Sequence, residues 1–303
     1  MFINESGLKT LILPISTEES VTIADRFMIR PLLPLLVQDG HYHMLWLSLN
    51  DPKLFRCTKH SMDEIALPDR PISLKAVLDT YNLEKQLQHH SGGSRSGRAG
   101  GTVFHGSESI RDSEKKRIEE YFRQIDGGLK KVLADDKSPV VLACVDYLDP
   151  IYRGVSRFPR LMDGHVSGSP ETIKRDILLD FGWRAASPHF EQIKDKALDN
   201  CRNLLGSPRV IEDIRLILPA ALHRQVDILF LLNGAQAWGR TDPSTGRVVL
   251  IEDRLPEFGE EELHDQAAIH TLRHGGQVFM LDSGEMPEQA ESLAVLRYDY
   301  TEM

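Results

Sequence analysis

Residues 113–145, SEKKRIEEYFRQIDGGLKKVLADDKSPVVLACV, predict a helix followed by a buried strand. Apolar residues recur there at steps of three and four, which is the spacing of one face of an amphipathic helix. These positions are Ile118, Tyr121, Phe122, Ile125, Leu129, Val132 and Leu133. Asp112 or Ser113 is expected to be the N-cap of this helix. The continuous apolar run 140–145 suits a strand that is covered on both faces.

A hairpin is predicted upstream of this helix. The stretch HYHMLWLSLNDPKLFRCTK, residues 41–59, holds two strand-length apolar runs on either side of Asn50-Asp51-Pro52. Hairpin, helix and buried strand together indicate an α/β domain. Residues 1–39 are too few to fold alone and are expected to form a short N-terminal segment.

The second half of the chain also interleaves helices and strands. Residues 157–171, RFPRLMDGHVSGSPE, are rich in turn formers, and we place a domain boundary there, between 168 and 169. Ser169-Pro170 and Ser187-Pro188 are helix start signals, so two separate helices are expected after the boundary. The expected elements are helices at 171–184, 188–205, 209–224 and 259–274, and strands at 226–232, 236–241, 247–251, 277–281 and 293–299.

The composition is typical of a soluble globular protein. The chain has 303 residues, 41% of them hydrophobic and 27% charged, which is enough for two domains. It contains neither a basic leader nor the ~18 consecutive apolar residues of a membrane span, so we expect a cytoplasmic protein. The three cysteines lack a paired spacing, and His270 with His274 lacks a further ligand nearby. We therefore expect no disulfide, no metal and no cofactor.

A glycine-rich, basic segment precedes the predicted helix. It reads EKQLQHHSGGSRSGRAGGTVFHGS over residues 84–107. Between Lys85 and Arg117 seven Lys or Arg face three acids, whereas the whole chain has a formal net charge of -9. Such a stretch cannot bury enough apolar surface to order itself, so a mobile loop is expected over 88–112. Its candidates for binding RNA phosphates are Arg95, Arg98, Arg111, Lys115 and Lys116.

Motifs for nucleotide binding and for hydrolysis are missing from the sequence. No Gly-Lys-Ser/Thr follows the glycines, and they do not open a helix directly from a strand. No GxSxG, Cys/His pair or local carboxylate pair supplies an obvious nucleophile or acid/base couple. Gly275-Gly276-Gln277 matches the GGQ signature of translation release factors, but it lies between a predicted helix and a predicted strand. We interpret these glycines as a helix C-terminal cap and turn.

The order of these elements resembles the middle and C-terminal domains of the class 1 release factors of archaea and eukaryotes. Phrases such as HYHMLWLSLNDPKLFRCT, SPVVLACVDYLDPIYR, QVDILFLLNGAQAWGRTDPSTGRV and AAIHTLRHGGQVFML look like the bacterial archaeo-eukaryotic release factor group, family 3. The resemblance covers residues from about 8 to 300. It implies a ribonuclease H-like middle domain over 40–168, without nuclease activity. It also implies a C-terminal domain over 169–303 that is similar to ribosomal kink-turn-binding proteins.

The resemblance also implies a site. In better-known members of the family a catalytic GGQ lies in the loop before the long middle-domain helix. Here Gly100 and Gly101 match its glycines, and Thr102 stands where glutamine is expected. Backbone N–H groups of these three residues could still position a water for attack on the peptidyl-tRNA ester. His89, His90 and His105 are loop histidines that titrate near neutral pH, and His90 and His105 are candidate proton donors or acceptors.

Two functions follow from the resemblance. The first is ribosome rescue or quality control without stop-codon reading, because the chain lacks a sizeable decoding domain. Its partners would be the ribosome, through rRNA and peptidyl-tRNA, and a GTPase or other protein at the acidic C-terminal domain. From Thr241 onward that domain has fourteen acids and four Lys or Arg. The alternative is a non-catalytic ribosome- or RNA-binding module that has lost the GGQ glutamine.

Overall fold

The structure is a computed structural model of the chain. It describes residues 1–4, 7–15, 19, 21–22, 26–33, 35, 40–68, 73–75, 108–169, 171–242, 247–251 and 259–300. The chain divides into two compact units, and each is described by itself. The central unit is His41–His189, and the terminal unit combines Met1–Gly40 with Phe190–Met303. The predicted domain limits at 168 and 169 stay a prediction.

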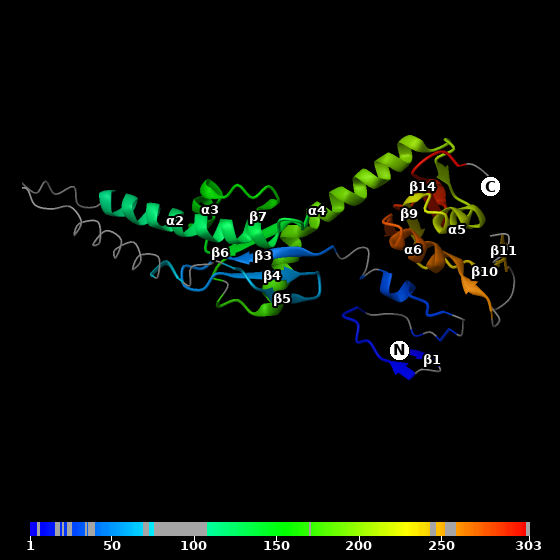
Figure 1. Ribbon diagram of the computed structural model, residues 1–303, viewed down its shortest axis with the longest axis horizontal. Helices are drawn as coiled ribbons and strands as arrows, with labels where there is room; N and C mark the ends of the chain where they lie inside the picture. The colour runs from blue at the N-terminus through cyan, green and yellow to red at the C-terminus, as the bar shows by residue number, and fades with distance from the viewer. Residues whose placement is uncertain are drawn as a thin grey trace, which may run out of the picture. The chain divides into compact units, whose positions relative to one another are not determined.

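A five-stranded sheet in the order β5-β4-β3-β6-β7 forms the middle of the central unit (Figure 1). Its strands are β3 (Tyr42–Trp46), β4 (Lys53–Cys57), β5 (Met62–Ile65), β6 (Val140–Cys144) and β7 (Leu161–Ser167). The predicted hairpin is β3 with β4, which pair antiparallel, whereas β6 lies parallel to both β3 and β7. Every residue of β6 is buried, as predicted for a strand covered on both faces.

Helices α2 (Glu108–Val132) and α3 (Leu148–Val155) pack into one core with the sheet. The apolar stripe predicted for α2 faces this core, and six of its seven positions are buried: Ile118, Tyr121, Phe122, Ile125, Leu129 and Leu133. The helix begins earlier than predicted, so the proposed N-cap at Asp112 or Ser113 is wrong. Residues 108–113 contain neither glycine nor proline, so nothing in this stretch prevents the helix from beginning at Glu108.

One long helix, α4 (Arg175–Leu204), replaces two of the predicted helices. Ser187-Pro188 does not start a new helix, because Pro188 lies inside α4. Proline removes one backbone hydrogen bond from a helix. Packing on both sides of Pro188 outweighs that loss: Ala186 is buried in the central unit, and Ala197 and Leu198 are buried in the terminal unit.

The turn-rich stretch 157–171 contains the edge strand β7, which the composition did not indicate. Its backbone pairs with β6, with Val166 opposite Ala143 and His165 opposite Leu142. Pairing with an open sheet edge is a long-range interaction, and it overrides the local preference of residues such as Gly164 for turns.

The terminal unit is built around a four-stranded sheet in the order β13-β9-β14-β8. Its elements are β8 (Val210–Ile211), α5 (Ile214–Leu222), β9 (Val226–Leu232), α6 (Leu263–Arg273), β13 (Gln277–Leu281) and β14 (Ser292–Leu296). Alternate residues of β9 face opposite sides, so Leu229 and Leu231 join a core with α5 and α6. Ile228 and Phe230 join a second core with the end of α4. Both units are mixed α/β layers, which confirms the predicted fold class.

Smaller elements complete the terminal unit. They are β1 (Phe2–Asn4), β2 (Gly7–Lys9), η1 (Arg30–Leu32), β10 (Trp238–Thr241), β11 (Val248–Leu250), β12 (Glu261–Glu262) and η3 (Pro287–Gln289). Strands β10 and β11 form the hairpin predicted around DPSTG. None of the described helices is long and apolar enough to cross a bilayer.

The Gly275-Gly276 pair ends α6, as predicted. Gly275 has a φ of +74°, in the left-handed region that favours glycine. Its N–H donates to the carbonyl of Leu272 at 3.1 Å, and the Gly276 N–H donates to the carbonyl of Thr271 at 2.9 Å. This is the Schellman arrangement of a helix C-terminus. The GGQ tripeptide at 275–277 is therefore a structural turn.

Candidate functional site

Most residues of the predicted site lie outside the described part of the chain. These are His89, His90, Arg95, Arg98, Gly100, Gly101, Thr102 and His105, and their roles stay predictions. Arg111 lies in the first turn of α2. Lys115 and Lys116 follow in the next turn, and both side chains are exposed.

The N-terminal part of α2 extends past the sheet (Figure 1). The hydroxyl of Tyr121 donates a hydrogen bond to the carbonyl of Ser48 at 2.9 Å, just after the end of β3. Tyr121 lies thirteen positions after Glu108 in the helix, which corresponds to roughly 20 Å. Residues 114–117 are exposed and Ile118 is buried, so the packed part of α2 is preceded by a part that extends past the carboxyl end of β3.

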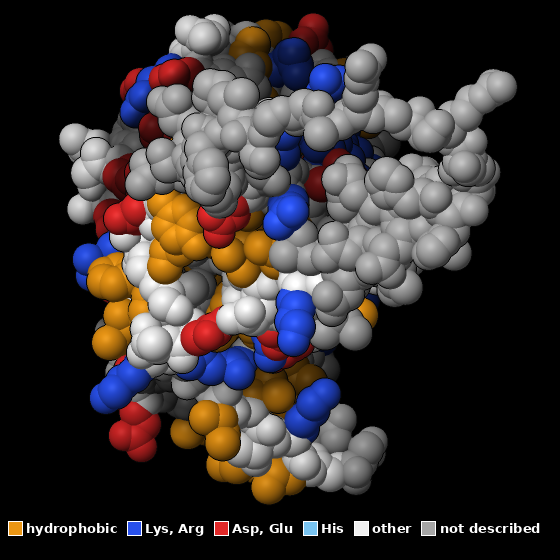
Figure 2. All heavy atoms as spheres, turned by 90° about the vertical axis from the view of Figure 1, so that its left-hand side faces the viewer, with side chains coloured by type: hydrophobic (Ala, Val, Ile, Leu, Met, Phe, Trp, Pro, Cys, Tyr) orange, Lys and Arg blue, Asp and Glu red, His pale blue; other side chains and the backbone are white. Residues whose placement is uncertain are grey.

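Positive charge gathers on this extended part of α2. Lys115, Lys116 and Arg117 are exposed, and none of them forms an ion pair with another described residue. The next cation, Arg123, is paired with Glu119 at 3.4 Å and with Glu120 at 2.9 Å. Figure 2 views the molecule from the side of this end and shows Lys and Arg side chains among hydrophobic and acidic ones. These cations can therefore contact an anionic partner without breaking an ion pair to another described residue.

Buried polar contacts hold the other half of α2 in place. Asp126 is 4% exposed and accepts a hydrogen bond from the Ser156 hydroxyl at 2.6 Å. Its second oxygen lies 2.6 Å from the Lys130 ammonium. Gly128 allows the backbone of Pro68 to approach, since a Cβ atom there would lie 2.5 Å from the Pro68 carbonyl oxygen. The basic end of α2 thus projects from a rigidly packed base.

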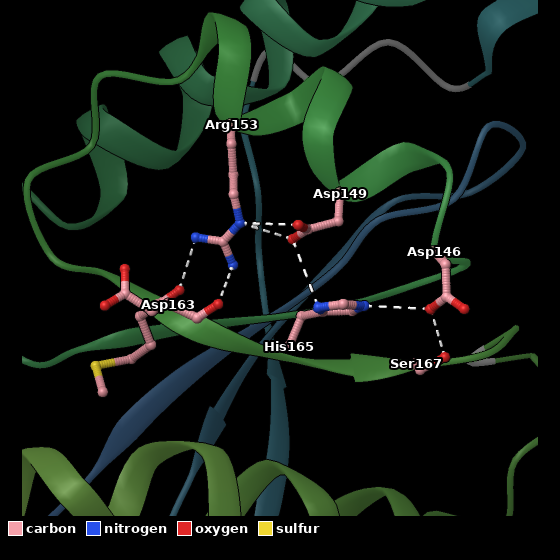
Figure 3. Close-up of polar contacts among 7 residues, drawn as sticks. Asp146, Asp149, Arg153, Asp163, His165 and Ser167 are labelled. Atoms are coloured by element: carbon pink, nitrogen blue, oxygen red, sulfur yellow. Dashed lines mark hydrogen bonds and ion pairs between the residues drawn. The ribbon is translucent and has the colours of Figure 1, made fainter.

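A second polar cluster lies at the carboxyl ends of β6 and β7, and Figure 3 shows its side chains. The His165 ring lies between two carboxylates, with Nε2 at 3.3 Å from Asp146 and Nδ1 at 3.8 Å from Asp149. Arg153 donates from Nε to both oxygens of Asp149 at 2.8 and 2.9 Å. The Ser167 hydroxyl donates to Asp146. We call these five residues the β6–β7 cluster.

The β6–β7 cluster ends in an accessible carboxylate. The Asp146 side chain is 76% exposed, and hydrogen bonds from Ser167 and then His165 lower its pKa. The Ser167 hydroxyl contacts the carboxylate and not the imidazole, so the cluster is not a Ser-His-Asp triad. It can hold a donor-rich or cationic group at a fixed position. The sequence analysis missed it, although the aspartates of DYLDP directly follow a predicted buried strand.

A third cluster, at the amino ends of β3 and β6, is structural. The Ser138 hydroxyl and Asp136 both contact Nε2 of His41, at 2.7 and 3.2 Å, whereas a triad uses the two ring nitrogens separately. In the described part of the chain, no group of three or more His, Cys, Asp or Glu side chains is arranged to hold a metal. Cys57, Cys144 and Cys201 are free and buried.

Comparison with known families gives a match over the central unit. The family described as "Bacterial archaeo-eukaryotic release factor family 7" matches residues 42–188, a little less than half of the chain. The match supports the predicted release-factor group for this part, whereas the predicted family number, 3, is not confirmed. No curated protein matches the chain in sequence.

Several solved structures of translation factors are similar to the chain. Dom34 of S. cerevisiae, described as a translation termination-like factor that interacts with Hbs1, is 12% identical over 86% of this chain and 63% of Dom34, with a TM-score of 0.39. Pelota of Archaeoglobus fulgidus is 12% identical over 86% of this chain and 64% of its own, with a TM-score of 0.31. Ribosome-bound archaeal Pelota, in a structure that also contains ABCE1, is 11% identical over 91% and 68% of the two chains, with a TM-score of 0.47. The chain spans less than two thirds of the length of Dom34 and of A. fulgidus Pelota. At these identities and scores no function follows from the similarity.

Proposed function

We propose that the protein is a ribosome-associated translation factor that acts in the cytoplasm in stop-codon-independent rescue of stalled ribosomes. The observation that carries this proposal is the family match. A release-factor family covers residues 42–188, which is almost the whole of the central unit, His41–His189. The unit that carries α2 and the preceding glycine-rich segment is therefore the part that resembles a release factor.

The geometry of α2 supports a role for that segment. The helix is anchored by Tyr121 and Asp126 and extends past the sheet toward its N-terminus. We propose that Arg95, Arg98, Arg111, Lys115 and Lys116 contact rRNA phosphates, since Lys and Arg supply most of the affinity of such interfaces. The backbone N–H groups of Gly100, Gly101 and Thr102 would then position the attacking water at the peptidyl-tRNA ester. His90 and His105 are the candidate proton donors or acceptors in this loop.

A protein partner is proposed for the terminal unit. Its sequence from Thr241 onward carries fourteen acids against four Lys or Arg, and this excess of negative charge disfavours RNA binding. We propose that a GTPase or another protein with a basic surface binds there.

The second candidate is a non-catalytic ribosome- or RNA-binding module. It is favoured by Thr102, because a threonine hydroxyl is shorter than the glutamine amide that it replaces in the GGQ motif. In this version the fold and the cations of α2 keep their role in binding, and hydrolysis is lost.

Peptide release from purified ribosomes stalled with a labelled peptidyl-tRNA tests the first candidate. The intact protein is compared with a variant that lacks residues 91–106. We expect release by the intact protein and none by the variant. Ribosome binding without release by either protein would reject hydrolysis and favour the binding module.

A further inference from the structure

Residues 26–33 of the terminal unit, here called the strap, lie against the start of α6. Leu33 is fully buried in the core that α5 and α6 share, and Ile29 packs against the same core. The Ile29 N–H donates to an oxygen of Asp265 at 3.0 Å. Arg26 lies at the rim, with its side chain 59% exposed and 3.2 Å from Glu261.

Arg30 is the central contact of the strap. Its guanidinium donates to an oxygen of Glu262 at 3.2 Å and to the carbonyl of Leu232 at 3.1 Å. The side chains of Arg30 and Glu262 are only 10% and 2% exposed, so this ion pair is shielded from water. The same carboxylate also caps α6, because Glu262 accepts the N–H of Asp265 at 2.6 Å.

The strap covers more negative than positive charge. Glu262 and Asp265 are 4% and 2% exposed, and Arg30 is the buried cation that faces them. His264 is buried as well and lies 3.3 Å from Glu262. Two further cations of the described residues near this site, Arg26 and Arg240, are more than half exposed and pair with Glu261 and Glu260. Among the described residues, Glu262 therefore has both Arg30 and His264 as side-chain partners, whereas Asp265 accepts a backbone N–H of the strap and forms no ion pair.

We propose that the strap is poised to detach from α6 at neutral pH, because its docked position buries the Asp265 carboxylate without an ion-pair partner among the described residues. Detaching would return Asp265 to water, where its charge is solvated and far less costly. Removing the charge of Asp265 while keeping its shape should consequently hold the strap more tightly.

The titration of Asp265 agrees with this inference. Burial is the largest effect and, with the neighbouring charge of Glu262, raises the pKa of Asp265 to about 6, although the N–H groups of Ile29 and Arg30 act in the opposite direction. A raised acid pKa means that the docked state binds a proton more tightly than the open state. Docking is therefore strongest at low pH and weakens as pH rises from about 4 to about 6. Above pH ~6.5 it stays at its weakest level.

Hydrogen exchange of the full-length chain at pH ~7.5 tests the proposal. In Asp265→Asn, the amides of residues 26–33 should exchange more slowly than in the wild type, by up to about 100-fold, because two pKa units correspond to that factor. Asp199→Asn is the matched control, since Asp199 is 69% exposed on α4, and it should leave strap exchange unchanged. Unchanged strap exchange in Asp265→Asn would overturn the proposal. So would an equal slowing in β9 and β13, because the substitution would then stabilise the whole unit.

A second measurement needs no substitution. Strap exchange in the wild type, corrected for the intrinsic pH dependence of the chemistry, should slow as pH falls from about 6.5 to about 5. Strap protection that does not change over this range would contradict the proposal. Neither measurement depends on ribosome binding, so their outcome is separate from that of the proposed function.

Discussion

The Tyr121 hydroxyl donates a buried hydrogen bond to the backbone carbonyl of Ser48 at 2.9 Å, and so fixes α2 to the carboxyl end of β3. The contact lies about one turn after the exposed residues 114–117, where the buried positions of α2 begin. It joins residues 73 positions apart in the sequence. The direction of the basic end of α2 is thereby set by the sheet and not by the helix alone.

Replacing Tyr121 by Phe should destabilise the central unit. The ring keeps its packing, but the buried carbonyl of Ser48 loses its donor, which costs about 1–2 kcal/mol. Urea unfolding followed by circular dichroism measures the change in the free energy of unfolding. Tyr298→Phe is a suitable control, because Tyr298 is 52% exposed. Equal stability of the wild type and Tyr121→Phe would show that the contact contributes nothing.

The two neighbouring glycines of α2 should respond oppositely to alanine. A Cβ at Gly128 would lie 2.5 Å from the Pro68 carbonyl oxygen, whereas a Cβ at Gly127 meets nothing within 4 Å. Gly127→Ala should stabilise the protein by roughly 0.5–1 kcal/mol through helix propensity. Gly128→Ala should destabilise it by about 1–3 kcal/mol through the backbone clash. Thermal unfolding of the two variants measures both stability changes. If both substitutions stabilise the protein, or both destabilise it, the close approach of Gly128 to Pro68 is refuted.

Acid should weaken the central unit through His43. This side chain is 2% exposed, and burial lowers its pKa to about 4. The unfolded chain then binds a proton that the folded protein excludes, so stability rises with pH between about 4 and 6.5. Asp136, 3.6 Å away, has a lowered pKa and stays charged throughout this range. The total effect should be up to about 3 kcal/mol.

The His43 prediction is checked by unfolding free energies measured at pH ~4.5 and pH ~7. In His43→Gln the difference between the two pH values should shrink relative to the wild type. A pH dependence of the same size in both proteins would assign the acid sensitivity to other groups.

Strands with two covered faces could be predicted from the sequence. The limits of Val226–Leu232 and Gln277–Leu281 agree with the prediction, because burial of most of their residues leaves largely apolar runs. Gly275 could be recognised because its position after a helix needs a positive φ. The edge strand β7 and the continuity of α4 through Pro188 could not be predicted from the sequence, because both depend on packing partners distant in sequence.

The site was predictable only in part. The exposure of Lys115 and Lys116 follows from their place opposite the apolar stripe of α2. The β6–β7 cluster could not be derived, because His165 belongs to a strand that local sequence did not indicate. The roles of Gly100, Gly101 and Thr102 rest on the family resemblance and stay predictions.

Sedimentation with purified, stalled ribosomes tests the central claim most directly. The full-length protein is compared with Lys115→Ala/Lys116→Ala and with the control Lys59→Ala/Lys137→Ala, whose lysines are also exposed in the central unit. We predict that the wild type and the control sediment with ribosomes, and that the α2 variant binds about tenfold more weakly, more so at higher salt. A wild-type protein that stays in the supernatant at low salt would contradict the proposal that this chain is a ribosome-associated factor.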